Sequence, residues 1–495
     1  MKKENKSALS IMLLASLILA SCGEAAAGSA DTTATAGDTT TAAPETEAEI
    51  ISNDLPDKDY GGFEFRILTT DEMNSVRWSF EIDAEAQNGE VLNDAVFNRN
   101  QAVEEAYNVK ITQMPTAKSS FLTTFTASVM AGDDAYDVLV HTAQEVMKNG
   151  YLYGLPVEDL PYVDTSRDWW DTVIMEQAAL GGVNYGLSGD INLVDDYATW
   201  AIFFNKALAE ENKVEDLYKL VYDGKWTQDA LRRICSDITR DLNGDSTLDY
   251  QDMWGMVASG NSAGSMLWSA GGMLGTLGKD GALTLSVDSA RNVEALTKIF
   301  DVFSSGQVLI TDRDIPTSVE GMTNWNYSYK IFSEGRTLFF GGCLSSLDYF
   351  RDMEDEFGYL PNPKFDENQK DYISTAQEWC ATMFLVPKTA PDPECTSIIL
   401  EAMASAAQHY ITPAFYDVQL ARKYSRDDES EAILDILFEN RVLDLVYTFN
   451  FGSARNIATA LKAESNTIAS TLASLKEAAQ SAYESTYAGV LAAKE

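Results

Sequence analysis

Histidine and positive charge are both scarce in this sequence. Two histidines in 495 residues leave little for a histidine-based metal centre or for general-base catalysis. The 36 Lys and Arg residues stand against 76 Asp and Glu residues, for a formal net charge of −40. Proteins that bind nucleic acids or anionic membrane surfaces neutralise phosphates with basic side chains. The composition therefore excludes nucleic-acid binding as the main function and argues against a basic membrane-binding patch.

Cysteine is rare as well, and two common nucleotide-binding motifs are missing. Beyond Cys22, the spacings of Cys235, Cys343, Cys380 and Cys395 match no zinc-binding pattern. We expect isolated buried thiols, although an extracellular location would allow one or two disulfides. No Gly-x-Gly-x-x-Gly motif follows a predicted strand, and no phosphate-binding loop motif occurs. No motif therefore indicates zinc or nucleotide binding.

The N-terminus has the pattern of an export signal. Residues 1–6 carry a net positive charge, and the fourteen-residue apolar run over 7–20 is too short to span a membrane permanently. The run ends in Leu19-Ala20-Ser21-Cys22, which resembles a bacterial lipobox. That resemblance implies removal of residues 1–21 and two acyl chains on Cys22, which would anchor a lipoprotein to the outer face of the bacterial cytoplasmic membrane. The alternative is an ordinary secretory signal with a chance cysteine.

Residues 22–59 are predicted to form a tether between the lipid and the folded body. From residue 24 to residue 50 the sequence is almost entirely Ala, Thr, Gly, Ser, Asp and Glu, without any aromatic residue, Lys or Arg. Such a segment cannot bury enough apolar surface to offset the entropy of ordering it. We therefore expect a disordered linker that extends by self-repulsion.

The body begins with alternating strand and helix patterns. Strands are predicted over 63–68, 109–111 and 136–140, and helices over 91–107 and 121–130. This β-α-β-α-β order implies an α/β protein with a parallel sheet and helices on both faces. Ligands of such sheets bind beyond the carboxyl ends of the strands, where His141 and the loop with Asp71 and Glu72 lie. Further helices are expected after the N-cap Thr227, over 289–305 and 392–407, and in an amphipathic tail beyond about residue 455.

Several segments of the body match a known group of proteins in their order and spacing. The segments are 89–96 with 108–111, 136–139, 184–187 with 200–206, 224–227, 332–338 and 357–361. Together they resemble the extracellular solute-binding lipoproteins of bacterial ABC importers, the family that includes maltose-binding and other oligosaccharide-binding proteins. The likeness covers about residues 61–455 and rests on the set of segments rather than on one motif.

The resemblance implies a two-lobed, periplasmic-binding-protein-like fold of type II with a helical C-terminal tail. Lobe 1 would comprise residues 60–193 and 362–409, and lobe 2 would comprise 194–361 and 410–495, with crossings near 190–200, 358–364 and 410. The implied function is capture of a solute without catalysis, in a cleft that closes by hinge motion. A carbohydrate or oligosaccharide is the expected solute, and the transmembrane subunits of an ABC permease are the expected partners of a monomeric receptor.

The chemistry of sugars indicates which side chains could line the cleft. A sugar presents hydroxyl groups around an apolar ring face, so its site needs aromatic platforms with carboxylate or amide partners. The candidates are Asp71, Glu72, Trp78, His141, Asp195, Asp196, Trp200, Trp268 and Trp379. In an extended segment Asp195 and Asp196 would point to opposite faces, so only one would face the cleft. Each Trp could instead belong to the core, and His141 could be structural.

An acidic loop over 241–252 resembles the calcium loop of EF-hand or dockerin proteins. The oxygen-bearing positions of the pattern are occupied by Asp241, Asn243, Asp245, Thr247, Asp249 and Asp252. Two departures are Ser246, where glycine usually makes the turn, and Asp252, which is shorter than the usual glutamate. The loop predicts a structural Ca²⁺ ion, with an acidic solvated turn as the alternative.

Two other classes of function, a hydrolase and a lipoprotein without a transport role, stay open on the sequence alone. Residues 260–264 match Gly-x-Ser-x-Gly, the nucleophile elbow of serine hydrolases, with Ser262 as nucleophile and His409 as the one histidine downstream. A carbohydrate-active hydrolase is also open, because coincidental acid pairs are common among 76 carboxylates. The remaining alternative is an adhesion or scaffolding lipoprotein. The strong negative charge makes a strongly anionic solute the least expected ligand.

Overall fold

The computed structural model of the protein describes residues 50–52, 54–70, 82–117, 119–378, 380–421 and 428–493. The predicted signal peptide, Cys22 and the predicted tether up to residue 49 lie outside the described residues. Along the ranges described, no helix combines the length and the apolar composition that crossing a membrane requires.

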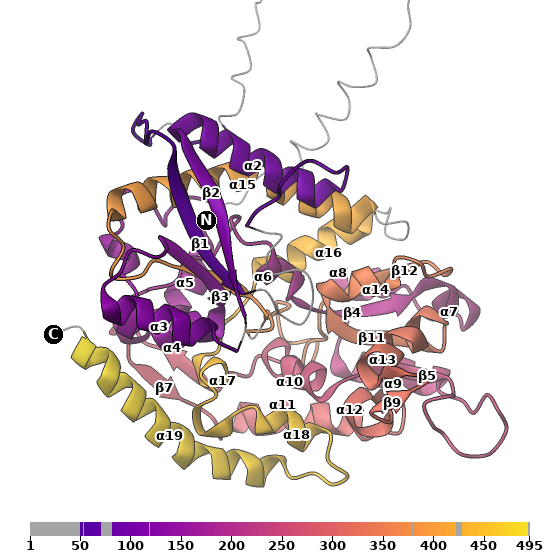
Figure 1. Cartoon of the computed structure of the whole chain (residues 1–495). Helices are drawn as coiled ribbons and strands as arrows, with labels where there is room; N and C mark the ends of the chain where they lie inside the picture. Colours follow the sequence, from indigo (N-terminus) through magenta and orange to yellow (C-terminus); the bar gives the residue numbers. More distant parts are fainter. Residues whose placement is uncertain are drawn as a thin grey trace, which may run out of the picture. The chain divides into compact units, whose positions relative to one another are not determined.

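The first sheet has four strands in the order β13-β3-β1-β2. β1 (Phe63–Thr70), β2 (Val109–Thr116) and β3 (Val138–Thr142) are parallel, whereas β13 (Thr382–Leu385) is antiparallel to β3. The helices around this sheet are α2 (Val91–Tyr107), which packs against the long α15 (Pro393–Ala421), and α3 (Phe121–Ala131) (Figure 1). The predicted β-α-β-α-β unit is confirmed. We call the elements around this sheet lobe 1.

Local sequence signals explain where the lobe 1 helices begin and end. α2 stops at Asn108, which adopts a left-handed φ of 49° that asparagine tolerates better than most residues. α4 (Ala143–Tyr153) starts directly after β3, because the side chain of Thr142 accepts a hydrogen bond from the backbone N–H of Glu145. This cap ends β3 and places His141 and Thr142 at the carboxyl edge of the sheet.

The second sheet has five strands in the order β12-β4-β11-β5-β8. β5 (Trp254–Ala258), β8 (Val308–Ile310) and β11 (Thr337–Cys343) are parallel, and β4 (Trp200–Asn205) is antiparallel to β11 and to β12 (Phe357–Leu360). Every residue of β4 is buried, as its continuous apolar run predicts for a strand with neighbours on both sides. We call the elements around this sheet lobe 2.

Helices and aromatic side chains cover the second sheet. α9 (Gln228–Ile238) and α13 (Asn324–Ser333) both contact it. Thr227 caps α9 as predicted, since its side chain accepts from the N–H of Ala230. The aromatic core includes Phe332 and Phe350, whose ring centroids are 4.6 Å apart. A fully buried Phe contributes roughly 1.5–3 kcal/mol to stability, so this core anchors lobe 2.

The remaining elements complete both lobes and the C-terminal region. In chain order they are η1 (Val157–Asp159), α5 (Thr172–Ala178), η2 (Leu180–Gly182), α6 (Val194–Tyr197), α7 (Lys206–Glu211), α8 (Leu217–Tyr222), α10 (Gly260–Ser269), β6 (Gly275–Leu277), β7 (Leu283–Leu285), α11 (Ala290–Phe303), α12 (Thr311–Asp314), β9 (Ser318–Val319), β10 (Met322–Thr323), η3 (Leu344–Ser346), α14 (Leu347–Phe350), α16 (Asp428–Glu439), α17 (Leu445–Thr448), η4 (Phe451–Ser453), α18 (Asn456–Leu461) and α19 (Ile468–Ala493). Cys235 and Cys395 are buried free thiols, as the sequence predicts.

Three chain segments run side by side between the two sheets. Thr199 forms a β-bridge with Ala376, and Ser374 forms one with Arg441. We call the segments at residue 199, at 374–377 and at 440–442 the first, second and third crossings. The second and third lie later in the chain than the predicted positions, 358–364 and 410. The third crossing cannot lie at residue 410, because helix α15 continues through that residue and Phe415, further along the helix, is buried. A lobe boundary at 409/410 would therefore cut a continuous helix.

The ordered body begins before residue 60. Lys58 forms an ion pair with Glu394 on α15, and Asp59 accepts a hydrogen bond from the side chain of Asn108 at 2.7 Å. These contacts attach the last residues of the predicted tether to lobe 1. The tether assigned to 22–59 is therefore too long at its C-terminal end.

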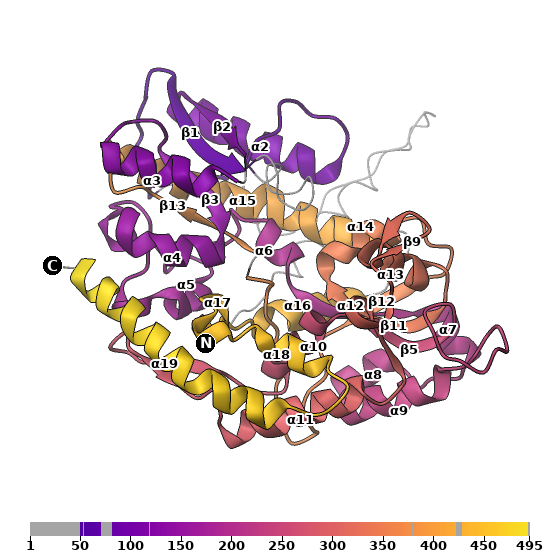
Figure 2. The same ribbon diagram turned by 60° about the horizontal axis from the view of Figure 1, so that its bottom comes forward.

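The C-terminal helix α19 crosses from one lobe to the other. It contacts α11 and α18 on the lobe 2 side, and η2 and α4 of lobe 1, so that it runs along the edge of both lobes in Figure 2. Ile468, Leu472 and Leu475 are buried along one face of this helix. The predicted amphipathic tail is confirmed and has a defined place in the fold.

Candidate ligand pocket between the lobes

A small pocket lies where the crossing segments meet lobe 2. Its walls are formed by Trp200, Asn261, Ser265, Trp268, Thr375, Ala376, Gln377, Glu378 and Tyr447, around a volume of about 240 Å³ that includes open solvent. These residues come from the start of β4, from α10, from the second crossing and from α17. The pocket therefore lies where lobe 2 meets the segments that connect it to lobe 1.

The topology explains why these side chains converge. Trp200 pairs with Cys343, the last residue of β11, so it lies at the carboxyl edge of the parallel strands. α10 begins directly after β5 at the same edge, and its residues 261, 265 and 268 share one helical face by their spacing. Carboxyl edges are where α/β sheets bind ligands.

The aromatic side of the pocket is held in place by packing and hydrogen bonds. The indole N–H of Trp268 donates to Asp444 Oδ2 at 3.2 Å, and its ring meets that of Tyr447 nearly edge-on at a centroid distance of 4.8 Å. Trp200 and Trp268 are only 7% and 4% exposed. Both indoles are therefore rigid walls with limited faces open to the pocket.

The polar side of the pocket is dominated by Glu378. Its side chain is buried, and burial raises its pKa to about 7 even though the guanidinium of Arg455 acts in the opposite direction. Oε1 of Glu378 lies 2.9 Å from Nη2 of Arg455. Ser265 adds a hydroxyl that receives a hydrogen bond from the Asn362 amide at 3.0 Å. The pocket thus offers aromatic rings, hydroxyls, amides and one carboxyl group.

Solved structures with the same architecture include several transport receptors. A cyclic α-maltosyl-1,6-maltose binding protein from Arthrobacter globiformis has a TM-score of 0.59 at 14% identity, over 86% of this chain and 100% of that one. UspC of M. tuberculosis has a TM-score of 0.57 at 16% identity, over 85% and 100%. An ABC substrate-binding protein from Listeria monocytogenes, in complex with cycloalternan, has a TM-score of 0.54 at 15% identity, over 86% and 99%. No family model matches the chain, and no curated protein matches it in sequence.

The chain has the fold of the ABC-transporter solute-binding proteins. The predicted type II, two-lobed α/β architecture and the resemblance to maltose- and oligosaccharide-binding proteins are both confirmed at the level of fold. Because the shared identity is low, the ligand has to be argued from the pocket itself.

The structure brings together two of the predicted ligand-binding residues and separates others. Trp200 and Trp268 line the same pocket. His141 is buried in lobe 1, where its ring lies 4.5 Å from that of Phe121 and its Nδ1 accepts from the N–H of Thr142 at 2.8 Å. This environment favours the structural alternative for His141. The remaining four predictions at Asp71, Glu72, Trp78 and Trp379 lie outside the described residues.

Asp195 and Asp196 belong to a buried ion cluster at the crossings. Arg441, on the third crossing, lies 2.9 Å from Asp196, 3.6 Å from Asp195 and 3.0 Å from Asp171. The expectation that the two neighbouring acids point to opposite faces is wrong, because residues 194–197 form the short helix α6 rather than an extended strand. Both carboxylates therefore approach one guanidinium, and they tie the first crossing to the third.

Sequence reasoning missed Glu378, Tyr447, Asn261 and Ser265 as pocket residues. Glu378 is one carboxylate among many, and neither amphipathic pattern nor motif distinguishes it. Asn261 and Ser265 did carry a signal, because they share a helical face with Trp268. Tyr447 comes from a region beyond the third crossing, whose path could not be predicted.

The acidic loop is built from backbone turns around its carboxylates. Asp241 accepts hydrogen bonds from the N–H groups of Gly244 and Ser246 at 2.7 and 2.8 Å, which lower its pKa. Ser246 adopts a positive φ of 68°, so it makes the turn where a calcium loop usually has glycine. Within the described ranges, no three His, Cys, Asp or Glu side chains are gathered as metal ligands. The loop backbone fits the pattern, but its carboxylates do not converge, and Ca²⁺ binding stays a prediction.

Ser262 is a capping residue in this structure. Its hydroxyl donates to the carbonyl oxygen of Gly341 at 2.8 Å and forms a capping box with Ser259 at the start of α10. The side chain is buried. The Gly-x-Ser-x-Gly match is therefore explained by helix capping, and it lacks the exposed hydroxyl of a nucleophile elbow.

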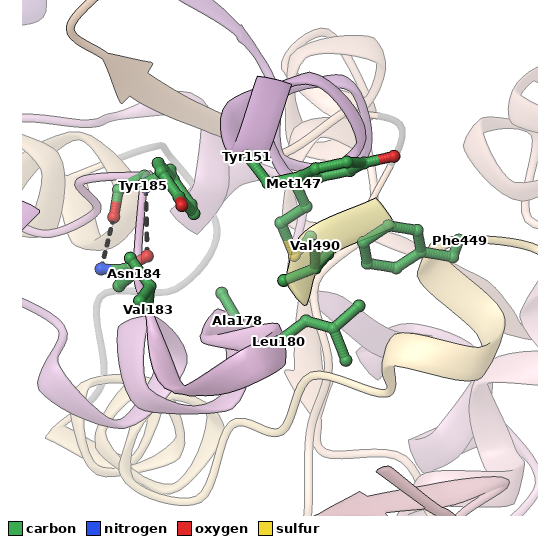
Figure 3. A pocket seen from close by; sticks show the side chains of 10 residues that line it. Met147, Tyr151, Ala178, Leu180, Val183, Asn184, Tyr185, Phe449 and Val490 are labelled. Atoms are coloured by element: carbon green, nitrogen blue, oxygen red, sulfur yellow. Dashed lines mark hydrogen bonds between the residues drawn. The ribbon is translucent and has the colours of Figure 1, made fainter. Parts of the chain in front are cut away.

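A second pocket lies beneath the C-terminal helix and is mostly apolar. Figure 3 shows Met147 and Tyr151 of α4, Leu180 of η2, Phe449 directly after α17, and Val490 of α19 around it. Its polar groups are the hydroxyls of Tyr151 and Tyr185 and the amide of Asn184, which is already hydrogen-bonded to the backbone of Gly186. The pocket offers little for a sugar and marks the junction between α19 and lobe 1.

Proposed function

We propose that the protein is a lipid-anchored solute-binding protein of an ABC importer. It captures a carbohydrate or oligosaccharide in the pocket between the lobes, closes over it by hinge motion and delivers it to the permease. No covalent step is involved. Hinge closure requires that the ligand bind the closed arrangement more tightly than the open one.

The convergence of Trp200, Trp268, Tyr447 and Glu378 at the crossings carries this proposal. Aromatic rings match the apolar faces of sugars, and a carboxylate accepts charge-assisted hydrogen bonds from hydroxyl groups. Relatives in fold support the same ligand class, since they include a protein that binds cyclic α-maltosyl-1,6-maltose and one in complex with cycloalternan.

Thermal-shift screening of the full chain tests the ligand class. The panel comprises maltotetraose, cycloalternan and cyclic α-maltosyl-1,6-maltose, with a set of oligopeptides of similar size as the comparison. A ligand of the folded state raises the melting temperature in proportion to its affinity and concentration. We expect at least one sugar to raise it. A shift with peptides and with no sugar would contradict the proposal.

The anchor and the ion are separate parts of the proposal. Replacing Cys22→Ala should move the protein from the membrane fraction to the culture medium. Adding Ca²⁺ should raise the melting temperature of the wild type and not that of Asp241→Asn, because Asp241 would be the first ligand of the loop. If Ca²⁺ leaves the melting temperature of the wild type unchanged, the predicted calcium site is contradicted, and the rest of the proposal is unaffected.

A further inference from the structure

Glu378 and Arg455 form an ion pair at the wall of the pocket. Glu378 lines the pocket on the second crossing and is 7% exposed. Arg455 lies between η4 and α18, and its Nη2 is 2.9 Å from Oε1 of Glu378. The pair therefore connects the pocket to the chain beyond the third crossing.

The hydrogen bonding of this buried ion pair is incomplete within the described part of the chain. Among the described residues, Oε1 of Glu378 meets the Arg455 guanidinium at ion-pair distance without good hydrogen-bond geometry, and Nε of Arg455 donates to no acceptor, although both atoms are buried. The two charged groups are close enough for strong electrostatic attraction, but their contact does not fill all of their hydrogen-bonding positions. Of this pair, Glu378 is the residue that lines the pocket, and a carboxylate accepts hydrogen bonds from hydroxyl groups.

Arg455 also contacts two other parts of the chain. Its Nη2 donates to the side chain of Gln144 at the start of α4 in lobe 1, and to the carbonyl oxygen of Thr448 at 3.3 Å. Its guanidinium lies 5.9 Å from the ring centroid of Tyr447, which also lines the pocket. One side chain thus links lobe 1, the second crossing and α17.

We propose that Glu378 is the carboxylate that accepts the hydroxyl groups of the ligand, and that Arg455 is the positioning residue that orients it. The inference rests on the proposed function and names residues that set its specificity. The ligand class is a neutral polyhydroxylated solute, because the positive charge of Arg455 is already matched by Glu378.

The ionisation of Glu378 supplies a readout that a purely structural role would not affect. Burial raises its pKa to about 7, while Arg455 and Lys148 lower it. The groups that face it are Arg455 from the segment before α18, Lys148 from α4 and the hydroxyl of Tyr447 from α17. The ionised carboxylate is therefore formed as the pH rises through about 7, and ligand affinity should rise with it.

The first experiment needs no ligand. The carboxyl carbons of Glu are labelled with ¹³C in the full chain, and the resonance that disappears in Glu378→Gln is followed against pH. We expect a midpoint near neutrality in the wild type, a higher midpoint in Arg455→Met, and a midpoint close to wild type in Arg455→Lys. Arg233→Met, which removes an exposed ion pair with Glu215, is the matched control and should change nothing.

The second experiment measures affinity for the strongest sugar of the panel by calorimetry at pH 5.5 and pH 8. Wild type should bind about tenfold more tightly at pH 8, which corresponds to one charge-assisted hydrogen bond. Glu378→Gln should lose this pH dependence, and Arg455→Met should bind weakly at pH 7, with Arg455→Lys rescuing part of the loss.

The outcomes separate this inference from the proposed function. A Glu378 midpoint near the ordinary value of about 4.3, or an equal midpoint in Arg455→Met, would overturn the role of Arg455 even if sugars bind. Tight sugar binding with the same pH dependence in Glu378→Gln would overturn the role of Glu378. If no sugar binds, the proposed function and the ligand contact fail together, while the resonance still decides whether Arg455 sets the ionisation of Glu378.

Discussion

Buried charges at the crossings show how single residues hold this molecule together. Arg441 stands on the third crossing and pairs with acids of the first crossing and of lobe 1. The coulombic attraction of three carboxylates raises its pKa against the effect of burial. Removing one partner of a buried ion pair leaves uncompensated charge in a poorly solvated place. The crossings are therefore fixed by electrostatics as well as by backbone hydrogen bonds.

Replacing Arg441→Met should destabilise the protein strongly. Loss of the guanidinium leaves Asp171, Asp195 and Asp196 without their shared cation, and the expected cost is about 3–5 kcal/mol in the free energy of unfolding. Urea denaturation measures this cost. Arg233→Met, on an exposed ion pair, should cost less than about 1 kcal/mol. Equal effects of the two substitutions would show that the buried cluster contributes no more than a surface pair.

At the scale of elements, the hairpin of β6 and β7 reaches from lobe 2 to lobe 1. The N–H of Gly181 in η2 donates to the carbonyl oxygen of Gly281 at 2.8 Å. Gly281 has a φ of +75°, and a Cβ atom there would lie 2.0 Å from the backbone nitrogen of Gly182. The hairpin can approach lobe 1 so closely only because both sides lack side chains.

The substitution Gly281→Ala should separate this hairpin from lobe 1. A positive φ alone costs roughly 1–2 kcal/mol for a residue with a Cβ, and the clash with Gly182 adds to that cost. Gly306→Ala is the matched control, because Gly306 has a φ of +78° and no heavy atom within 4 Å of the added Cβ. Thermal unfolding should show a larger loss for Gly281→Ala. Equal losses would mean that the hairpin contact does not constrain the fold.

The elements of lobe 1 were predictable because their signals are local. The helix of residues 91–107 and its stop at Asn108 follow from periodicity and from one residue that tolerates a left-handed conformation. The position of the third crossing was not predictable, because it depends on how long α15 keeps packing on α2. The aromatic half of the pocket could be anticipated from sugar chemistry at Trp200 and Trp268. The acidic half of the pocket could not be anticipated, because Glu378 differs from the other carboxylates of the chain only in its burial by the tertiary structure.

At the scale of the whole molecule, α19 restrains the arrangement of the lobes. Lys476 forms an ion pair with Asp288 at 2.9 Å, and Leu283 donates its N–H to the hydroxyl of Tyr483 at 2.9 Å, so this part is attached to lobe 2. Further along, Val490 is buried against Gly181 of lobe 1 beside the apolar pocket (Figure 3). Hinge motion must either carry this end of α19 along or detach it from lobe 1.

Replacing Val490→Asp should detach the end of α19 from lobe 1. The substitution buries an unpaired charge, which costs more than the loss of the apolar contact alone. We expect faster proteolysis of the last turns and a broader distribution of lobe separations in small-angle scattering. Leu491→Asp lies on the exposed face and should leave both measurements unchanged. The same result for both variants would show that this end of α19 is already free in solution.

The claim that the interlobe pocket binds a sugar is tested most directly by calorimetry on two tryptophan variants. Trp200 lines the pocket, whereas Trp325 is 43% exposed on α13 and does not line it. With the strongest sugar of the panel, Trp200→Ala should weaken binding about tenfold or more, since an aromatic platform contributes roughly 0.5–1.5 kcal/mol beyond its buried area. Trp325→Ala should bind like the wild type, and circular dichroism confirms that both variants are folded. Equal affinity of Trp200→Ala and wild type would contradict the assignment of this pocket as the ligand site.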